Sequence, residues 1–223
     1  MNRHASRRAK LIKLLRKSQL DALLVTEVAN VTYLTGFTGD DSYLFLTPKT
    51  AVIISDFRYI TQLKDECPDL DAEFRGTGST ILDVTGTIAQ KTKIGVLGIE
   101  GNSINLTTYN QLSSKLPKSV EVTSTTGLVE TLREIKDAEE IALTRKAVWC
   151  AEKAFEVVRN GLEADQTERE AAFELEHVMR RFGAEGCSFP PIVAVGPRAA
   201  LPHARPTDQR IGEAPFVLID WGA

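Results

Sequence analysis

The sequence has few cysteines, and those it has are not arranged as a framework. Its 223 residues include three, Cys67, Cys150 and Cys187, which are far apart and belong to no CxxC or Cys/His pair. An odd number at such spacing predicts neither a disulfide framework nor a zinc knuckle. We therefore expect a protein of a reducing compartment, the cytoplasm.

Long apolar runs and an excess of one charge are also missing. The uninterrupted apolar stretches are a few residues long, whereas a helix that spans a bilayer needs about 20 apolar residues. Lys and Arg number 27 against 30 Asp and Glu, which gives a net charge of -3 and no general attraction to nucleic acid or anionic lipid. We expect neither a membrane nor a nucleic-acid partner. With 43% hydrophobic and 26% charged residues, the composition is typical of a globular protein of one large or two small domains.

The amino-terminal segment is basic, with seven Lys or Arg and no acid in its first seventeen residues. Such a segment can be a transit peptide or a basic patch. Leu11, Leu14 and Leu15, however, lie at helical spacing, and the segment leads directly into the apolar run 21–26. We therefore predict a surface helix with one buried stripe.

The pattern of residues 20–125 predicts an α/β domain, because apolar runs alternate with turn signals and helical stretches. The turn-rich segment 122–127 is followed by a helical pattern that continues to Gly161. We therefore expect a first domain, 1–128, and a second, 129–223. The strand candidates are 21–26, 43–47, 50–55 and 93–100, and the helical candidates are 57–66 and 80–90.

A further helix is predicted after Thr167, which forms a capping-box pattern with Glu170. Gly183 is expected to end this helix. His177 lies off its apolar stripe, so we interpret it as a solvated surface histidine. The stripe consists of Ala171, Leu175, Val178, Met179 and Phe182.

Two polar residues near the carboxyl end are candidate site residues. Asp220 follows four apolar residues, and an ionised carboxylate at the end of a buried strand needs a partner. His203 lies between Pro202 and Pro206, which restrict the backbone on both sides and mount the imidazole on a stiff loop. From the residues alone, an exposed His203 without function and a turn or cap Asp220 remain open alternatives.

An ordered series of motifs resembles the Xaa-Pro aminopeptidases and prolidases, the proline-peptide hydrolases of the creatinase-like pita-bread fold. The resemblance covers nearly the whole chain. It rests on "NVTYLTGFTGDDSYLFLT" (30–47), "SDFRY" (55–59), "LREIKDAEEI" (132–141), "GAEGCSF" (183–189), "IVAVG" (192–196), "AALPH" (199–203) and "VLIDWGA" (217–223).

The resemblance implies a metallopeptidase that cleaves peptides with proline at the second position, acts as an aminopeptidase or a dipeptidase, and forms a homodimer. His203 would line the substrate pocket and hydrogen-bond the reacting peptide. Asp220 would be the first carboxylate of a site for two divalent ions, about 3.5 to 4 Å apart in such enzymes. Oxygen-rich ligands favour Mn²⁺, with Co²⁺ or Zn²⁺ as alternatives.

The sequence departs from the family in its metal ligands. A second aspartate, a histidine and two glutamates belong, in the family, to the part of the domain after position 223, and one carboxylate cannot hold two divalent ions. We therefore expect a truncated piece of a longer hydrolase, inactive alone: an α/β creatinase-like domain followed by the first part of an α+β pita-bread domain. Two alternatives stay open, a creatinase-type metal-free amidinohydrolase and a non-catalytic protein that dimerises through its first domain. Asp220 in "IDWGA" argues against the first.

Overall fold

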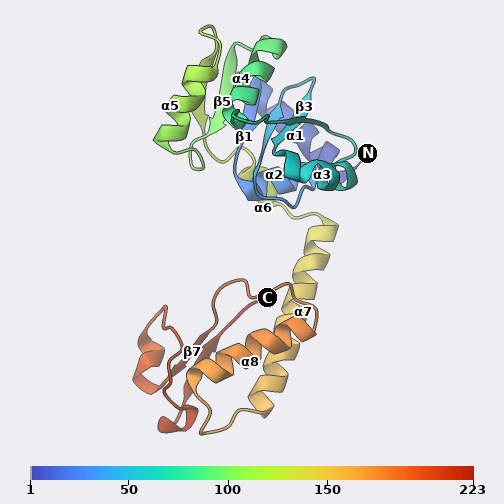
Figure 1. The fold of residues 1–223 in the computed structure, drawn as a ribbon. Helices are drawn as coiled ribbons and strands as arrows, with labels where there is room; N and C mark the ends of the chain where they lie inside the picture. The colour runs from blue at the N-terminus through green and yellow to red at the C-terminus, as the bar shows by residue number, and fades with distance from the viewer. Residues whose placement is uncertain (1) are drawn as a thin grey trace. The chain divides into compact units, whose positions relative to one another are not determined.

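The computed structural model describes residues 2–223 and divides into two compact units (Figure 1). Unit 1 ends at Ile135, and unit 2 covers Lys136–Ala223. The boundary expected near residue 128 lies before helix α6 (Glu130–Glu134), and the division in the structure falls after that helix. The reason is that Val129 is buried in a core cluster of unit 1. The domain assignment 1–128 and 129–223 itself stays a prediction.

A six-stranded sheet forms the middle layer of unit 1. Its strands are β1 (Ala22–Val25), β2 (Ser42–Leu46), β3 (Ala51–Ser55), β4 (Asp71–Phe74), β5 (Val96–Glu100) and β6 (Glu121–Thr125). They lie in the order β4-β3-β2-β1-β5-β6. β2 pairs antiparallel with both β1 and β3, and the other three pairings are parallel.

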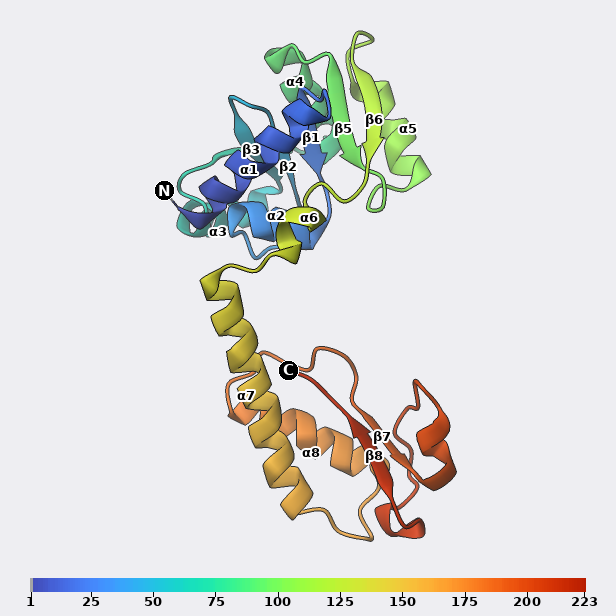
Figure 2. The same cartoon turned by 180° about the vertical axis from the view of Figure 1, so that it is seen from behind.

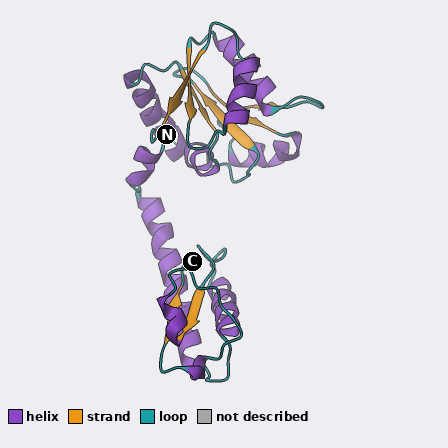
Figure 3. Ribbon diagram, turned by 90° about the vertical axis from the view of Figure 1, so that its left-hand side faces the viewer, coloured by secondary structure: helices purple, strands orange, loops and turns teal. Residues whose placement is uncertain are grey.

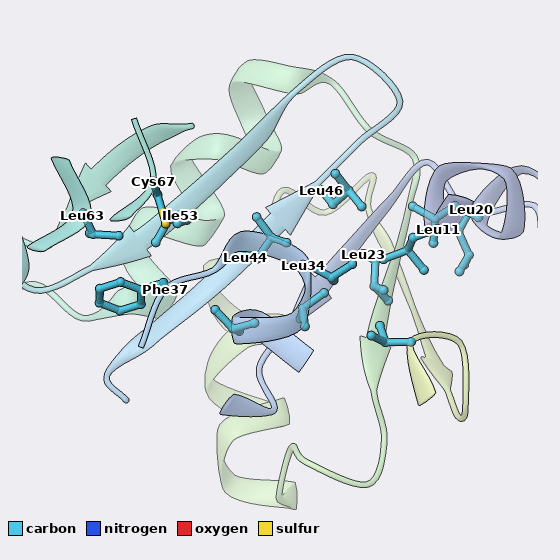
Figure 4. Close-up of a cluster of buried hydrophobic side chains, with 14 residues drawn as sticks. Leu11, Leu20, Leu23, Leu34, Phe37, Leu44, Leu46, Ile53, Leu63 and Cys67 are labelled. Atoms are coloured by element: carbon cyan, nitrogen blue, oxygen red, sulfur yellow. The ribbon is translucent and has the colours of Figure 1, made fainter. Parts of the chain in front are cut away.

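Helices cover both faces of this sheet (Figure 3). Residues of α1 (Arg3–Lys17), α2 (Val28–Thr35) and α3 (Ile60–Glu66) share a core cluster with Leu23 and Val25 of β1 (Figure 4). Residues of α4 (Ile81–Thr92) and α5 (Leu106–Lys115) share the other with Ala22 and Leu24. Successive side chains of a strand point to opposite faces, so all four residues of β1 are buried, two in each core.

The sequence predictions for unit 1 are confirmed for four strands and three helices. Leu11 and Leu15 bury one stripe of α1, as expected for the basic amino-terminal segment. Strands β4 and β6 and helices α2 and α5 were not predicted. The interpretation of 122–127 as a turn-rich segment is wrong for its first part, because Val122 and the residues beside it pair in register with β5. β-Branched Val and Thr suit an edge strand.

Unit 2 contains two helices and a two-stranded antiparallel sheet, β7 (Ile192–Val195) with β8 (Val217–Asp220) (Figure 2). Helix α7 (Ala138–Asn160) packs against α8 (Glu168–Arg181). The helical pattern expected from residue 128 to Gly161 is interrupted, because Asp137 caps α7 with Glu140 in a capping box. The expected fold class, an α/β unit followed by the start of an α+β domain, is confirmed.

Helix α8 begins and ends as the sequence predicts. Thr167 Oγ1 accepts the Glu170 N–H, and the Glu170 carboxylate accepts the Thr167 N–H. Gly183, at φ 99°, follows the last turn in the left-handed region that glycine adopts without strain. His177 is exposed, as expected. No helix in residues 2–223 combines the length and the apolar character that a membrane crossing requires.

Candidate functional site

Asp220 ends β8, but the strand is not buried on both sides. Val217 and Ile219 pack in clusters with residues of the helices, whereas Leu218 and Asp220 alternate with them on an exposed face. The prediction that Asp220 bears a burial cost and needs a partner for that reason is therefore wrong. The error arose because four apolar residues in a row look fully buried, while the α-helices cover only one side of this two-stranded sheet.

The residue after Asp220 ties the end of β8 to α7. The Trp221 indole N–H donates to the Ala151 carbonyl at 3.0 Å. Its ring stacks on Phe155 with the ring centroids 4.2 Å apart. The backbone that carries Asp220 is thus fixed, while its carboxylate stays accessible to solvent.

The loop that carries His203 lies over the face of the sheet that presents Asp220. In the antiparallel pair, Ile192 stands opposite Asp220 and Ala194 opposite Leu218, so these side chains share one face. Ala204 is buried in a cluster with Ile192 and Ala194. The structure therefore brings His203 and Asp220 to the same side of the sheet. Among residues 2–223, no direct interaction between their side chains is described.

The local backbone presents the His203 imidazole to solvent. A 3₁₀ helix, η2 (Gly196–Ala200), follows β7, and the Leu201 N–H closes its end on the Arg198 carbonyl at 3.0 Å. The Ala204 N–H donates to the Leu201 carbonyl at 3.3 Å, so His203 lies within a tight turn. Its side chain is exposed.

One polar residue of this region was missed by the sequence analysis. Glu168, in the first turn of α8, is fully buried. Its carboxylate accepts hydrogen bonds from Val195, Arg198 and Thr207, which lie on either side of His203 in the sequence. A signal was present, because Glu168 falls at helical spacing from the buried stripe residues Ala171 and Leu175, whereas first-turn acids are ordinarily solvated.

Burial opposes ionisation of the Glu168 carboxyl. The hydrogen bonds from the Thr207 hydroxyl, the Val195 and Thr207 N–H groups and Arg198 outweigh that effect, so the pKa of Glu168 lies below its ordinary value. The carboxylate is therefore ionised at neutral pH and available to all of its donors.

The described residues do not by themselves fit a site for two metal ions. Among residues 2–223, no three His, Cys, Asp or Glu side chains are grouped so that they could hold a metal. Asp220 is one accessible carboxylate, and a hard divalent ion requires several oxygen ligands. We therefore derive no catalytic step that uses a metal from this arrangement.

Unit 1 contains a cavity of about 800 Å³ that includes none of the predicted site residues. Leu20 and Ile94 contribute apolar surface to it, and Arg16, Lys49 and Lys93 contribute cations. Basic residues at the ends of α1 and α4 also stabilise the helix termini. The cavity is therefore distinct from the chemistry expected of His203 and Asp220.

Comparison with known families agrees with the division of the chain. Residues 7–135 match the creatinase/prolidase N-terminal domain, and residues 142–223 match metallopeptidase family M24. The first match covers more than half of the chain.

Individual relatives match over almost the whole chain. It is 34% identical over 96% of its length to the uncharacterized peptidase YqhT of Bacillus subtilis, and 29% identical over 96% to an Xaa-Pro dipeptidase of Pyrococcus furiosus. A solved Xaa-Pro dipeptidase from Bacillus anthracis superposes on 99% of the chain with a TM-score of 0.93 and 30% identity. The chain spans only 60%, 59% and 61% of these three proteins, respectively. From its sequence and its fold, the chain belongs to the family in which a creatinase/prolidase N-terminal domain precedes a metallopeptidase family M24 domain.

Proposed function

We propose that the protein hydrolyses Xaa-Pro peptide bonds, together with a further segment corresponding to the part of its relatives that these 223 residues do not span. The observation that carries the proposal is that the loop around His203 and the residue Asp220 lie on the same face of the β7-β8 sheet. Relatives described as Xaa-Pro dipeptidases support the substrate class.

Each residue has a separate part in this proposal. The exposed His203 donates a hydrogen bond to the reacting peptide, where a donor stabilises charge that develops in the transition state. Asp220 would supply one ligand to a pair of divalent ions, with Mn²⁺ preferred over Co²⁺ or Zn²⁺. The other ligands come from outside residues 2–223, so the chain alone is inactive and binds no metal tightly. A cytoplasmic location and a homodimer belong to the same proposal.

The test uses the chain extended by the coding sequence that follows codon 223, or fused to the part of the Bacillus subtilis relative that it does not span. With Mn²⁺, we expect release of the amino-terminal residue from an Xaa-Pro peptide but not from the matched Xaa-Ala peptide. Dipeptides and longer peptides, assayed side by side, distinguish the two peptidase types. Equal turnover of the Pro and Ala peptides, or full activity after exhaustive chelation, would contradict the proposal.

Two substitutions separate the assigned parts. His203→Ala should lower kcat by roughly 10²-fold or more with bound metal unchanged, because a lost donor weakens transition-state stabilisation. Asp220→Ala should reduce the bound metal measured by atomic emission. His177→Ala, an exposed histidine on α8, is the matched control and should retain wild-type turnover. Wild-type turnover in both site variants would show that the assignments are wrong.

A further inference from the structure

Glu168 is a fully buried carboxylate whose hydrogen-bonding capacity is used entirely by one segment. Oε1 accepts the Val195 N–H at 2.8 Å, and Oε2 accepts the Thr207 N–H at 2.8 Å and the Thr207 hydroxyl at 2.7 Å. Arg198 Nε donates to both oxygens, at 3.1 and 3.2 Å. Burying an ionised carboxylate costs several kcal/mol unless such donors receive it, so this arrangement requires the segment in its observed place.

The donors lie at the two ends of one loop. We call residues 196–206 the His203 loop. Val195 immediately precedes it, and Thr207 immediately follows it. Within the loop, Arg198 is held by Glu168 and also donates through Nη2 to the Arg205 carbonyl at 2.6 Å. Glu168 therefore joins the two ends of the loop directly, and Arg198, near the start of the loop, adds a second link to Arg205 near its end.

We propose that Glu168 is the positioning residue for His203: its carboxylate closes the His203 loop at both ends and so fixes the position of His203 within it. The inference rests on the proposed function of His203 in Xaa-Pro hydrolysis. Glu168 does not touch the substrate, and it acts only through the loop.

The hydrogen bonds that Glu168 accepts require a carboxylate on a side chain of this length. Every partner is a donor, and the two oxygens serve opposite ends of the loop. A glutamine has the same shape, but its NH₂ group is a donor and would face the N–H of either Val195 or Thr207. One of these two hydrogen bonds would therefore be lost, and that end of the loop would be released. An aspartate keeps the charge but lacks the reach to serve both ends.

The first test needs no activity and uses the 223-residue chain. In Glu168→Gln, we expect amide exchange at Val195 or Thr207 to become at least about tenfold faster, as is typical when a charge-assisted hydrogen bond is lost. The NMR signals of the His203 ring should change as well. The matched control is Glu174→Gln, an exposed glutamate on the same helix, which should show wild-type exchange. Unchanged exchange at both amides in Glu168→Gln would overturn the inference.

The second test uses the extended protein. Glu168→Gln should lower kcat while changing KM little, because a displaced donor is missed mainly in the transition state, and Glu168→Asp should recover part of the loss. If Glu168→Gln fails to fold, Thr207→Val takes its place, because it removes one hydroxyl donor and keeps the backbone. If Glu168→Gln shows faster amide exchange in the loop but keeps the wild-type kcat, the proposal that Glu168 positions His203 is refuted. An extended wild-type protein that has a closed loop but does not cleave Xaa-Pro peptides would refute the proposed function and leave loop closure standing.

Discussion

Glu100 is a second buried carboxylate. Its surroundings raise its pKa, whereas those of Glu168 lower the pKa of that residue. Its oxygens accept hydrogen bonds from the Thr26 and Glu27 N–H groups at 2.6 and 2.8 Å and from the Asn30 amide at 2.6 Å. Burial nevertheless dominates, and the nearby Glu130 carboxylate adds repulsion, so the pKa of Glu100 is raised. Glu168, by contrast, has an arginine partner. At Glu168 the hydrogen bonds, led by that from the Thr207 hydroxyl, outweigh burial, whereas at Glu100 burial and the Glu130 carboxylate outweigh them.

The raised pKa of Glu100 predicts how the stability of unit 1 varies with pH. Above the ordinary value of 4.5 and up to the folded-state pKa, the folded protein binds more protons at this site than the unfolded chain. The contribution of Glu100 is therefore most favourable at low pH and is lost as pH rises through the folded-state pKa. Relative to Glu100→Gln, the wild type should be more stable at about pH 5 than at about pH 8, as measured by urea unfolding.

The control is Glu121→Gln, which changes an exposed acid on the neighbouring strand. Its stability should follow that of the wild type at both pH values. An equal stability difference between wild type and Glu100→Gln at the two pH values would contradict the predicted effect of burial.

Polar residues in motif-like settings were singled out from the sequence, whereas polar residues that are buried were missed. His203 and Asp220 were singled out from flanking prolines, a strand end and the motifs that carry the family resemblance, and their assigned functions stay predictions. Glu168 and Glu100 were missed because their partners are backbone N–H groups distant in sequence. Helical spacing could have indicated the burial of Glu168, but contacts of this kind depend on tertiary packing, which the local spacing of residues does not report.

At the scale of single elements, capping boxes define where some of the helices in both units begin. Three occur among residues 2–223, with N-caps Thr80, Asp137 and Thr167 before α4, α7 and α8. Each supplies an acceptor to a helix N–H group that has no partner within the helix. The cap at Thr167 also sets the start of α8, and therefore the place of Glu168 one residue later.

Loss of this cap should destabilise unit 2 measurably. Thr167→Ala removes the hydroxyl that accepts the Glu170 N–H, and we expect a loss of about 1 kcal/mol in the free energy of unfolding by urea. Thr144→Ala, at an exposed interior position of α7, is the matched control and should cost little, because alanine favours helix interiors. Equal effects of the two substitutions would contradict the assigned cap.

The elements that could be predicted are those in which burial and sequence pattern agree. β1, β2, β3 and β5 are apolar and mostly buried. β4 and β6 were missed because these edge strands are largely polar and exposed, so no apolar run stands out. The interruption before α7 was missed because Ile135 and Lys136 continue the helical composition across a cap.

At the scale of the whole molecule, the two units differ in their cores. Unit 1 has clusters of fourteen and thirteen buried residues, one on each face of its sheet. The largest cluster of unit 2 has five. Since buried apolar area supplies most of the stabilisation, unit 1 is expected to be the more stable.

Calorimetry should therefore show two unfolding transitions. We expect the lower one to belong to unit 2, and an isolated fragment of residues 1–135 should retain the upper one at nearly the same temperature. Limited proteolysis below the upper transition should leave the same fragment protected. A single transition with equal calorimetric and van't Hoff enthalpies would show instead that the units unfold together.

The order of strands in unit 1 has a consequence for encounters between copies. The sheet is bounded by β4, which contains Asp71 and Glu73, and by β6, which begins with Glu121. Neither strand contains a lysine or an arginine. Two copies that approach strand to strand would bring carboxylates together, and like charges placed opposite each other destabilise strand pairing. The sheet of unit 1 should therefore resist edge-to-edge pairing between copies, and with it the continuous sheet growth that produces fibrils.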